Sequence, residues 1–172
     1  MQLYVIVPTY NEKDNLPKLL EQLLVLPVDL KVINVDDGSP DGTGAIADEW
    51  AAKDSRVIAV HRLGKLGLGT AYIAGYRKAF SLDATHVLTM DADFSHNPKY
   101  IPEMIKQMKH YDLVLGSRLV EGGSDADRSA IRQFVTKGAN LYIRLMLGLK
   151  VKDCNSGFRC FRREILEKVN LN

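Results

Sequence analysis

The chain has 172 residues, 46% of them hydrophobic, which is enough for one domain with a proper core. Its 23 basic and 21 acidic residues leave a formal charge of +2, so no global field marks a nucleic-acid-binding protein. The two cysteines, Cys154 and Cys160, are too few for a disulfide framework, and no Cys/His set has zinc-ligand spacing. A reducing, cytosolic location is therefore expected.

The start of the chain lacks the charged residues and long apolar stretch of a signal peptide. The sequence also contains no run of about 18 apolar residues, the length that a membrane-spanning helix needs. We therefore expect neither a leader nor a membrane span in these residues.

Short apolar runs alternate with helical patterns along the chain. Runs rich in Val, Ile and Leu predict buried strands at 3–7, 30–35, 56–60, 86–90 and 112–116. Helices are predicted at 16–24, 45–50, 70–80, 98–109 and 162–169, with Asn97 as the cap of the fourth. This order predicts an α/β fold whose mainly parallel sheet carries helices on both faces.

Polar or glycine-rich residues follow each predicted strand. In parallel sheets, ligands bind beyond the carboxyl ends of the strands. The five clusters lie at 8–12, 36–39, 64–69, 91–93 and 116–118. One such cluster alone is as readily an ordinary loop, but five at one edge of a sheet indicate a binding site.

Asp91 and Asp93 flank a single alanine directly after the fourth predicted strand. Two carboxylates this close repel each other unless a cation shares them, and oxygen ligands of this kind suit Mg²⁺ or Mn²⁺. The alternative is that either aspartate caps the helix that begins near Pro98. The position at a strand end favours metal or nucleotide binding.

Two further clusters have both a functional and a structural interpretation. Asp36 and Asp37 could accept hydrogen bonds from a ribose or a base, but their segment is also rich in turn-forming residues. Both interpretations hold if one aspartate serves the turn and the other the ligand. The segment 64–70 could present backbone N–H groups and Lys65 to phosphate, although its glycine spacing matches no standard phosphate-binding motif.

Four basic residues follow the fifth predicted strand: Arg118, Arg128, Arg132 and Lys137. Such a set could bind a second anionic group. A solvated helix face is the better interpretation for Arg128 and Lys137, whereas Arg118 ends a strand at the expected functional edge.

Taken together, these motifs resemble the family 2 glycosyltransferases of GT-A (Rossmann-like) fold. The resemblance rests on Val7-Pro8-Thr9-Tyr10-Asn11-Glu12, on Asp36-Asp37-Gly38-Ser39-Pro40-Asp41-Gly42-Thr43, and on the segment 64–72. Met90-Asp91-Ala92-Asp93-Phe94-Ser95-His96 and Asn155-Ser156-Gly157-Phe158-Arg159 narrow it to the dolichyl-phosphate mannosyltransferases. It covers essentially the whole chain, so residues 1–172 are expected to form a single catalytic domain. Family domains continue beyond the last motif, which implies that this one is short at its C-terminus.

The resemblance implies specific roles for residues at these motifs. Donor-binding positions are Pro8, Tyr10, Glu12, Val35, Asp37, Lys65, Asp91, Ala92, Asp93 and Arg118, some of them through backbone atoms. Asp93, with Asp91, is expected to bind the metal, whereas Ser95 stands where some members carry a further ligand. Arg118 is expected to bind phosphate near the reacting centre, with Arg132 as a further acceptor contact, so the catalytic set is Asp91, Asp93 and Arg118.

The implied reaction transfers mannose from GDP-mannose to dolichyl or another polyprenyl phosphate, with Mg²⁺ or Mn²⁺ and with inversion. A phosphate monoester is already an anionic nucleophile at neutral pH, so no catalytic base is assigned. UDP-glucose as the donor is the alternative within the same class. A non-catalytic sugar-nucleotide-binding protein and an aspartyl-nucleophile phosphatase, with Asp91 phosphorylated, are alternatives from other classes.

A polyprenyl acceptor implies a peripheral position at the cytoplasmic face of a membrane. The segment 128–150 mixes basic and apolar residues, which suits an interfacial helix and equally a helix packed on the domain. A membrane-anchoring partner subunit or a further C-terminal segment is the other expected means of attachment.

Overall fold

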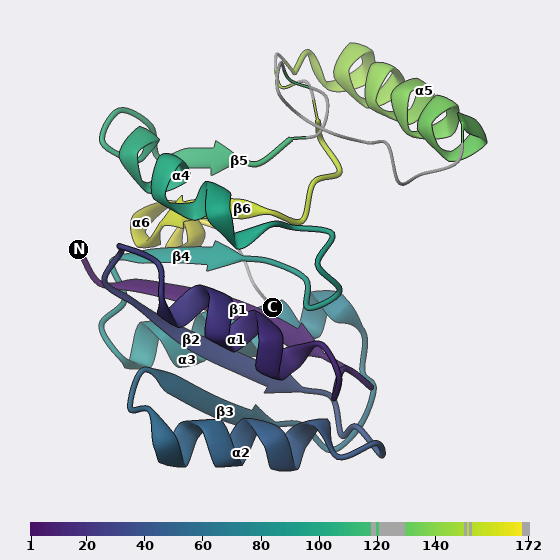
Figure 1. The fold of residues 1–172 in the computed structure, drawn as a ribbon. Coiled ribbons are helices and arrows are strands. Elements are labelled where there is room, and N and C mark those ends of the chain that lie inside the picture. Colours follow the sequence, from purple (N-terminus) through teal and green to yellow (C-terminus); the bar gives the residue numbers. More distant parts are fainter. Residues whose placement is uncertain (118–119, 121–129, 150, 152, 170–172) are drawn as a thin grey trace.

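The computed structural model describes residues 1–117, 120, 130–149, 151 and 153–169. Within α5 (Ala130–Leu147), the side chains of residues 130–134 and 137 are outside the description. The described chain forms a central sheet with helices on both of its faces (Figure 1).

Six strands of the described chain form one sheet in the order β3-β2-β1-β4-β6-β5. They are β1 (Leu3–Thr9), β2 (Leu30–Asp36), β3 (Val57–His61), β4 (His86–Thr89), β5 (Leu113–Leu115) and β6 (Arg159–Arg162). β1 pairs in parallel with β2 and β4, and β2 with β3, whereas β6 is antiparallel to both β4 and β5. The mainly parallel sheet and all five predicted strands are confirmed. β6 was not predicted, and it separates the fourth predicted strand from the fifth.

Two hydrophobic cores cover the two faces of the sheet. One face packs against α1 (Leu16–Leu24), α2 (Thr43–Lys53) and α4 (Ile101–Gln107), and the other against α3 (Leu68–Ser81) and α6 (Arg163–Glu167). Side chains of β1 alternate between them, with Leu3, Val5 and Val7 in the first core and Tyr4 and Ile6 in the second. Because both faces are buried, the strands are continuous apolar runs instead of alternating patterns.

A short 3-10 helix, η1 (Pro98–Tyr100), leads into α4. The Asn97 side chain accepts a hydrogen bond from the Lys99 N–H at 3.0 Å, which confirms Asn97 as the cap. Neither Asp91 nor Asp93 has this role, so the capping alternative for these aspartates is wrong.

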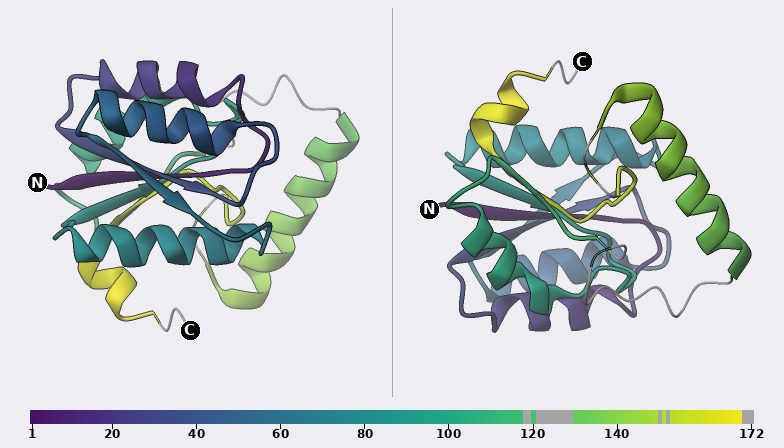
Figure 2. Two further views of the ribbon diagram at one scale, coloured as in Figure 1. Left: turned by 90° about the horizontal axis from the view of Figure 1, so that it is seen from below. Right: turned by 90° about the horizontal axis from the view of Figure 1, so that it is seen from above.

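The parallel strands β1 to β4 all point toward one edge of the sheet, as the two views of Figure 2 show. The loops after β1, β2 and β4 therefore meet there, together with the start of α3. This arrangement brings residues as far apart in the sequence as Pro8 and Asp93 to one place, where both line the site described below.

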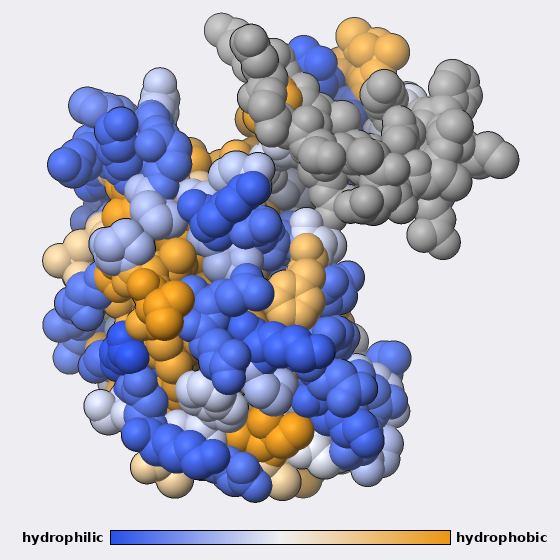
Figure 3. Space-filling model, in the orientation of Figure 1, coloured by the Kyte–Doolittle hydropathy of each residue, from blue (hydrophilic) through white to orange (hydrophobic). Residues whose placement is uncertain are grey.

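α5 extends away from the sheet (Figures 1 and 2). None of its described side chains belongs to either core, and a hydrogen bond from the Cys154 N–H to Asn140 Oδ1, at 2.7 Å, ties it to the segment before β6. Its described side chains include exposed apolar residues: Val135, Leu141, Tyr142, Leu145, Met146 and Leu147. The face of the protein body shown in Figure 3 is largely hydrophilic, with several hydrophobic areas. Among the described residues, no helix has the length and apolar character to cross a membrane.

Candidate donor and metal site

A pocket of about 260 Å³ lies at the carboxyl edge of the sheet. It is lined by Pro8, Thr9, Tyr10, Glu12, Asp37, Lys65, Gly67, Leu68, Ala71, Asp91, Ala92 and Asp93. Eight of the ten predicted donor-binding residues are in this lining, contributed by four separate segments of the chain. The structure thus brings together residues that the sequence analysis assigned to one ligand.

The remaining predicted residues lie elsewhere. Val35 is fully buried in the core on the α3 face and does not line the pocket. Arg118 and Arg128 are outside the described residues. Arg132 and Lys137 belong to α5 by their backbone, but their side chains are also outside the description.

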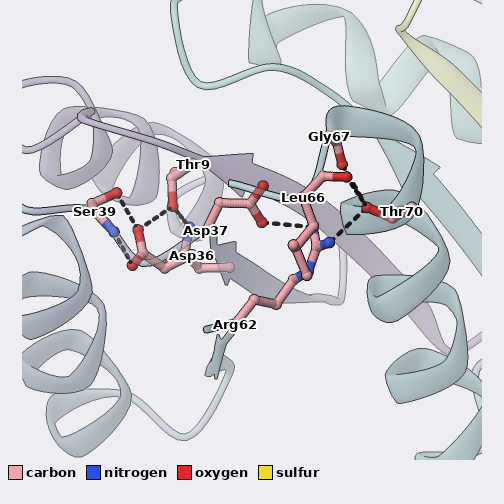
Figure 4. Close-up of polar contacts among 9 residues, drawn as sticks. Thr9, Asp36, Asp37, Ser39, Arg62, Leu66, Gly67 and Thr70 are labelled. Carbon is pink, nitrogen blue, oxygen red and sulfur yellow. Dashed lines mark hydrogen bonds and ion pairs between the residues drawn. The ribbon is translucent and has the colours of Figure 1, made fainter. Parts of the chain in front are cut away.

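Asp36 and Asp37, for which a turn role and a ligand role were both open, lie in different surroundings. Asp36 is buried and accepts hydrogen bonds from the Ser39 N–H at 3.0 Å and the Ser39 hydroxyl at 2.5 Å, so it fixes the turn after β2. Asp37, one residue later, lines the pocket. Figure 4 shows the two carboxylates directed to different partners.

Asp37 forms an ion pair that the sequence analysis did not anticipate. Arg62, directly after β3, donates from Nη1 to Asp37 Oδ1 at 2.6 Å and from Nη2 to the Thr70 hydroxyl at 2.6 Å (Figure 4). Both charged side chains are about nine-tenths buried, at 10% and 8% exposure, so the pair is little screened by solvent. Arg62 therefore links the end of β2 to the first turn of α3.

Lys65 lies over the ring of Tyr10, with its ammonium 4.3 Å from the ring centroid. This distance is within the range of a cation–π interaction. Gly67, the residue directly before α3, has a φ of +99°, a backbone conformation that L side chains rarely adopt. A positive charge and a helix N-terminus therefore face the same pocket, a combination that favours an anionic ligand.

Asp91 is held by two neighbours. The Tyr72 hydroxyl donates to Asp91 Oδ1 at 2.8 Å, and the Asp91 N–H donates to His96 Nδ1 at 3.0 Å. Since Nδ1 accepts this bond, the proton of a neutral imidazole is on Nε2. The 3.7 Å approach of His96 Nδ1 to Asp91 Oδ2 is then not an ion pair.

Asp93 occupies the exposed part of the same turn. Its Oδ1 accepts the Ser95 N–H at 2.9 Å, and the intervening Phe94 has a φ of +60°, uncommon for a bulky residue. Such backbone strain persists only where surrounding structure imposes it, and it concentrates at functional sites. Phe94 packs against the core, which helps to hold the turn in place.

The turn after β4 offers two carboxylates, those of Asp91 and Asp93, to a divalent metal. No three Asp, Glu, His or Cys side chains come together as a metal site within the described part of the chain. This donor set fits Mg²⁺ or Mn²⁺ bound with a diphosphate, because such ions often take one or two protein carboxylates and complete their shell with phosphate oxygens and water. It does not fit a closed structural site of four protein ligands.

Arg62, Tyr72 and His96 are site residues that the sequence analysis did not single out. Arg62 follows a predicted strand, which was a usable signal. Tyr72 and His96 lay inside quoted motifs, but nothing in a linear sequence indicates that α3 crosses the sheet next to Asp91.

Known proteins provide an independent comparison. Residues 4–169 match the model described as "Glycosyl transferase family 2". The chain is 41% identical over 172 residues to undecaprenyl-phosphate mannosyltransferase of Micrococcus luteus, and it spans 71% of that protein. It is 42% identical over 170 residues to polyprenol monophosphomannose synthase of Mycolicibacterium smegmatis, 98% of this chain and 64% of that protein.

Solved structures share the fold at lower identity. A mannosyltransferase of Pyrobaculum calidifontis in complex with GDP-Man and Mn²⁺ matches with a TM-score of 0.67 at 22% identity, over 98% of this chain and 46% of that chain. Glucosyl-3-phosphoglycerate synthase of Mycobacterium tuberculosis, in complex with Mn²⁺, UDP and phosphoglyceric acid, matches with a TM-score of 0.68 at 22% identity. This second match covers 98% of this chain and 58% of that chain.

Proposed function

Since the chain belongs to glycosyltransferase family 2, we propose that it transfers mannose from GDP-mannose to a polyprenyl phosphate, with a divalent metal and with inversion. The observation that carries the proposal is the convergence of eight motif residues on one pocket in a chain that is 41–42% identical to two polyprenyl-phosphate mannosyltransferases. The chain spans 71% and 64% of these relatives, so the activity of a whole protein is inferred from its catalytic part. Membership of the family disfavours the phosphatase alternative.

The donor nucleoside is assigned to the side of the pocket formed by the loops after β1 and β2. Tyr10 offers an aromatic face, and Asp37 offers a buried acceptor for N–H or O–H groups of a base or ribose. Pro8 and Glu12 complete this side of the pocket, whereas Val35 is fully buried and lies outside the lining. Lys65 and the start of α3 are on the side where phosphate charge is expected.

Asp93, with Asp91, is assigned to the metal and the diphosphate. A bound Mg²⁺ or Mn²⁺ would stabilise the negative charge that develops on the departing GDP. Asp91 is the more restrained carboxylate because Tyr72 donates to it, which leaves Asp93 as the more adaptable ligand. Ala92 is 3% exposed and leaves room for the donor between the two aspartates.

The acceptor brings its own nucleophile. Its phosphate is largely ionised at neutral pH, so it needs nearby cations more than a general base. Arg118, after β5, and Arg132, on α5, are proposed for this role from their sequence positions. Arg118, Asp91 and Asp93 are then the three residues that we assign nearest to the reacting phosphate and sugar atoms.

α5 supports a position at a membrane surface. Its exposed apolar side chains belong to neither core, and Arg144 lies among them on the same helix. A helix of this composition favours the interface between lipid headgroups and acyl chains, where a polyprenyl phosphate presents its phosphate. We therefore place the protein at the cytoplasmic face of the membrane, alone or with a further segment or subunit as its anchor.

A transfer assay tests the proposal. The protein, Mn²⁺ and a polyprenyl phosphate are incubated with labelled GDP-mannose or labelled UDP-glucose, and label in the lipid fraction is counted. Lipid labelled from GDP-mannose is the expected result. Lipid labelled from UDP-glucose instead would favour the glucosyltransferase alternative, and nucleotide binding without labelled lipid would indicate a non-catalytic binding protein.

A further inference from the structure

The turn between β2 and α2 holds the backbone of the donor-binding loop after β1. Three successive N–H groups of that loop donate to side chains of the turn. Asn11 donates to Ser39 Oγ at 3.0 Å, Glu12 to Thr43 Oγ1 at 2.9 Å and Lys13 to Asp41 Oδ2 at 3.2 Å. The two segments are 28 to 31 residues apart in the sequence, so these bonds fix one loop against another.

The loop needs such support because its backbone is unusual. Asn11 has a φ of +61°, a left-handed conformation that asparagine tolerates better than most residues. Tyr10 and Glu12, on either side of it, both line the pocket. A shift in the backbone of Asn11 would therefore displace both of these lining residues.

The turn is itself rigid. Asp41 Oδ1 accepts the Thr43 hydroxyl at 2.6 Å and the Thr43 N–H at 3.0 Å, which orients Thr43 toward Glu12. Ser39 is oriented in the same way by Asp36, which also accepts the Thr9 hydroxyl at 3.2 Å. Gly42, at φ +95°, lets the chain turn into α2 between these acceptors.

We propose that Ser39, Asp41 and Thr43 are positioning residues for the nucleotide, which act by holding the Asn11–Lys13 N–H groups and with them Tyr10 and Glu12. These three side chains are absent from the lining of the pocket, so their effect passes through the loop. The inference rests on the proposed function for the identity of the ligand, whereas the hold on the loop is a property of the protein alone.

Two measurements on the same variants, amide hydrogen exchange and GDP binding, test the hold on the loop and its effect on the ligand separately. Thr43→Val removes the acceptor for the Glu12 N–H but keeps a β-branched side chain in its buried position. We expect faster amide hydrogen exchange at residues 11–13 without ligand, and a dissociation constant for GDP with Mn²⁺ raised about tenfold, as for one lost hydrogen bond. Thr43→Ser restores the hydroxyl and is expected to restore both values.

Thr85→Val is the matched control. The Thr85 hydroxyl accepts the Gln2 N–H at 2.9 Å, the equivalent bond at the opposite end of β1, away from the pocket. This variant is expected to change exchange near Gln2 but not GDP binding. Ser39→Ala, which removes the acceptor for Asn11, gives a second variant if Thr43→Val does not fold.

Unchanged exchange at residues 11–13 in Thr43→Val would overturn the inference. So would faster exchange with wild-type affinity for GDP, since the bonds would then be structural only. If the wild-type protein bound no GDP, the proposed function would fail, while the exchange data would still decide whether the turn holds the loop.

Discussion

The Tyr72 hydroxyl donates a hydrogen bond to Asp91 Oδ1 at 2.8 Å, from α3 across to the turn after β4. Burial, together with the negative charge of Asp91, raises the pKa of Tyr72 well above its ordinary value of 10.0. The phenol therefore stays protonated and remains a donor throughout the physiological pH range. Tyr72 thus keeps one oxygen of Asp91 in place before any ligand binds.

Loss of this hydroxyl is expected to weaken donor binding. Tyr72→Phe frees Asp91 to adopt other orientations, so the dissociation constant for GDP-mannose with Mn²⁺ should rise about tenfold. Tyr76→Phe is the control, because Tyr76 stacks beside Tyr72 on α3, with ring centroids 6.4 Å apart, while the hydrogen bond to Asp91 described above comes from Tyr72. Titration calorimetry on both variants measures this dissociation constant. Equal affinities for Tyr72→Phe and wild type would exclude a role of the Tyr72 hydroxyl in donor binding.

α3 approaches β1 too closely for any side chain at Gly75. A Cβ there would lie 2.4 Å from Ile6 Cγ2 and 3.0 Å from Ile6 Cδ1, in a fully buried part of the core. Overpacking of this kind typically costs about 1–3 kcal/mol, so Gly75→Ala should lower the free energy of unfolding in urea by that amount. Gly69→Ala, near the start of the same helix with open space around it, is expected to change stability much less. Comparable losses in both variants would contradict the packing argument.

The depressed pKa of Asp41 leads us to expect a lower free energy of unfolding in acid. Burial alone would raise its pKa, but hydrogen bonds from the Thr43 hydroxyl, the Thr43 N–H and the Lys13 N–H outweigh burial and hold the pKa below the ordinary value of 3.8. A carboxyl group with a depressed pKa in the folded state stabilises the protein above its unfolded-state pKa, and this contribution is lost as the pH falls through its folded-state pKa. Below about pH 4, the free energy of unfolding should therefore fall with pH, and less steeply in Asp41→Asn. Parallel pH profiles for the two proteins would show that Asp41 contributes nothing to this loss.

Much of the fold could be predicted from the sequence because the buried strands are continuous apolar runs and α1 carries a clear apolar stripe of Leu16, Leu19, Leu20 and Leu23. β6 was not predicted because its sequence is short and has an arginine at each end, Arg159-Cys160-Phe161-Arg162. Its place between β4 and β5 depends on long-range pairing, which local pattern does not encode.

The pocket could be predicted to a similar extent, for a different reason. Polar residues that follow parallel strands lie at the same edge of the sheet, so Asp37 and Asp91 are expected close together once the topology is known. The Arg62–Asp37 and Tyr72–Asp91 contacts depend on side-chain directions, which spacing alone does not supply. The motif from Asp36 to Thr43 was assigned to a ligand or a turn, and three of its side chains, Ser39, Asp41 and Thr43, hold the loop after β1.

Membrane contact through α5 is expected to depend on its apolar side chains. Leu141 and Leu145 are 55% and 75% exposed and one helical turn apart, so the pair Leu141→Ser with Leu145→Ser should reduce sedimentation with anionic lipid vesicles severalfold. Val25→Ser, at the end of α1 and 80% exposed, removes an exposed apolar side chain from the body of the protein and should have no effect. If the α5 variant sediments like wild type, the membrane is contacted elsewhere.

The central claim is that the pocket at the carboxyl edge binds a sugar nucleotide through a metal held by Asp93. The most direct measurement is titration calorimetry of GDP with and without Mn²⁺, on wild type and on Asp93→Asn. We predict Mn²⁺-dependent binding by the wild-type protein and a loss of affinity of at least about tenfold in Asp93→Asn, with the thermal unfolding midpoint of the unliganded protein unchanged. Equal Mn²⁺-dependent affinity in the two proteins would contradict the assignment of the metal to Asp93.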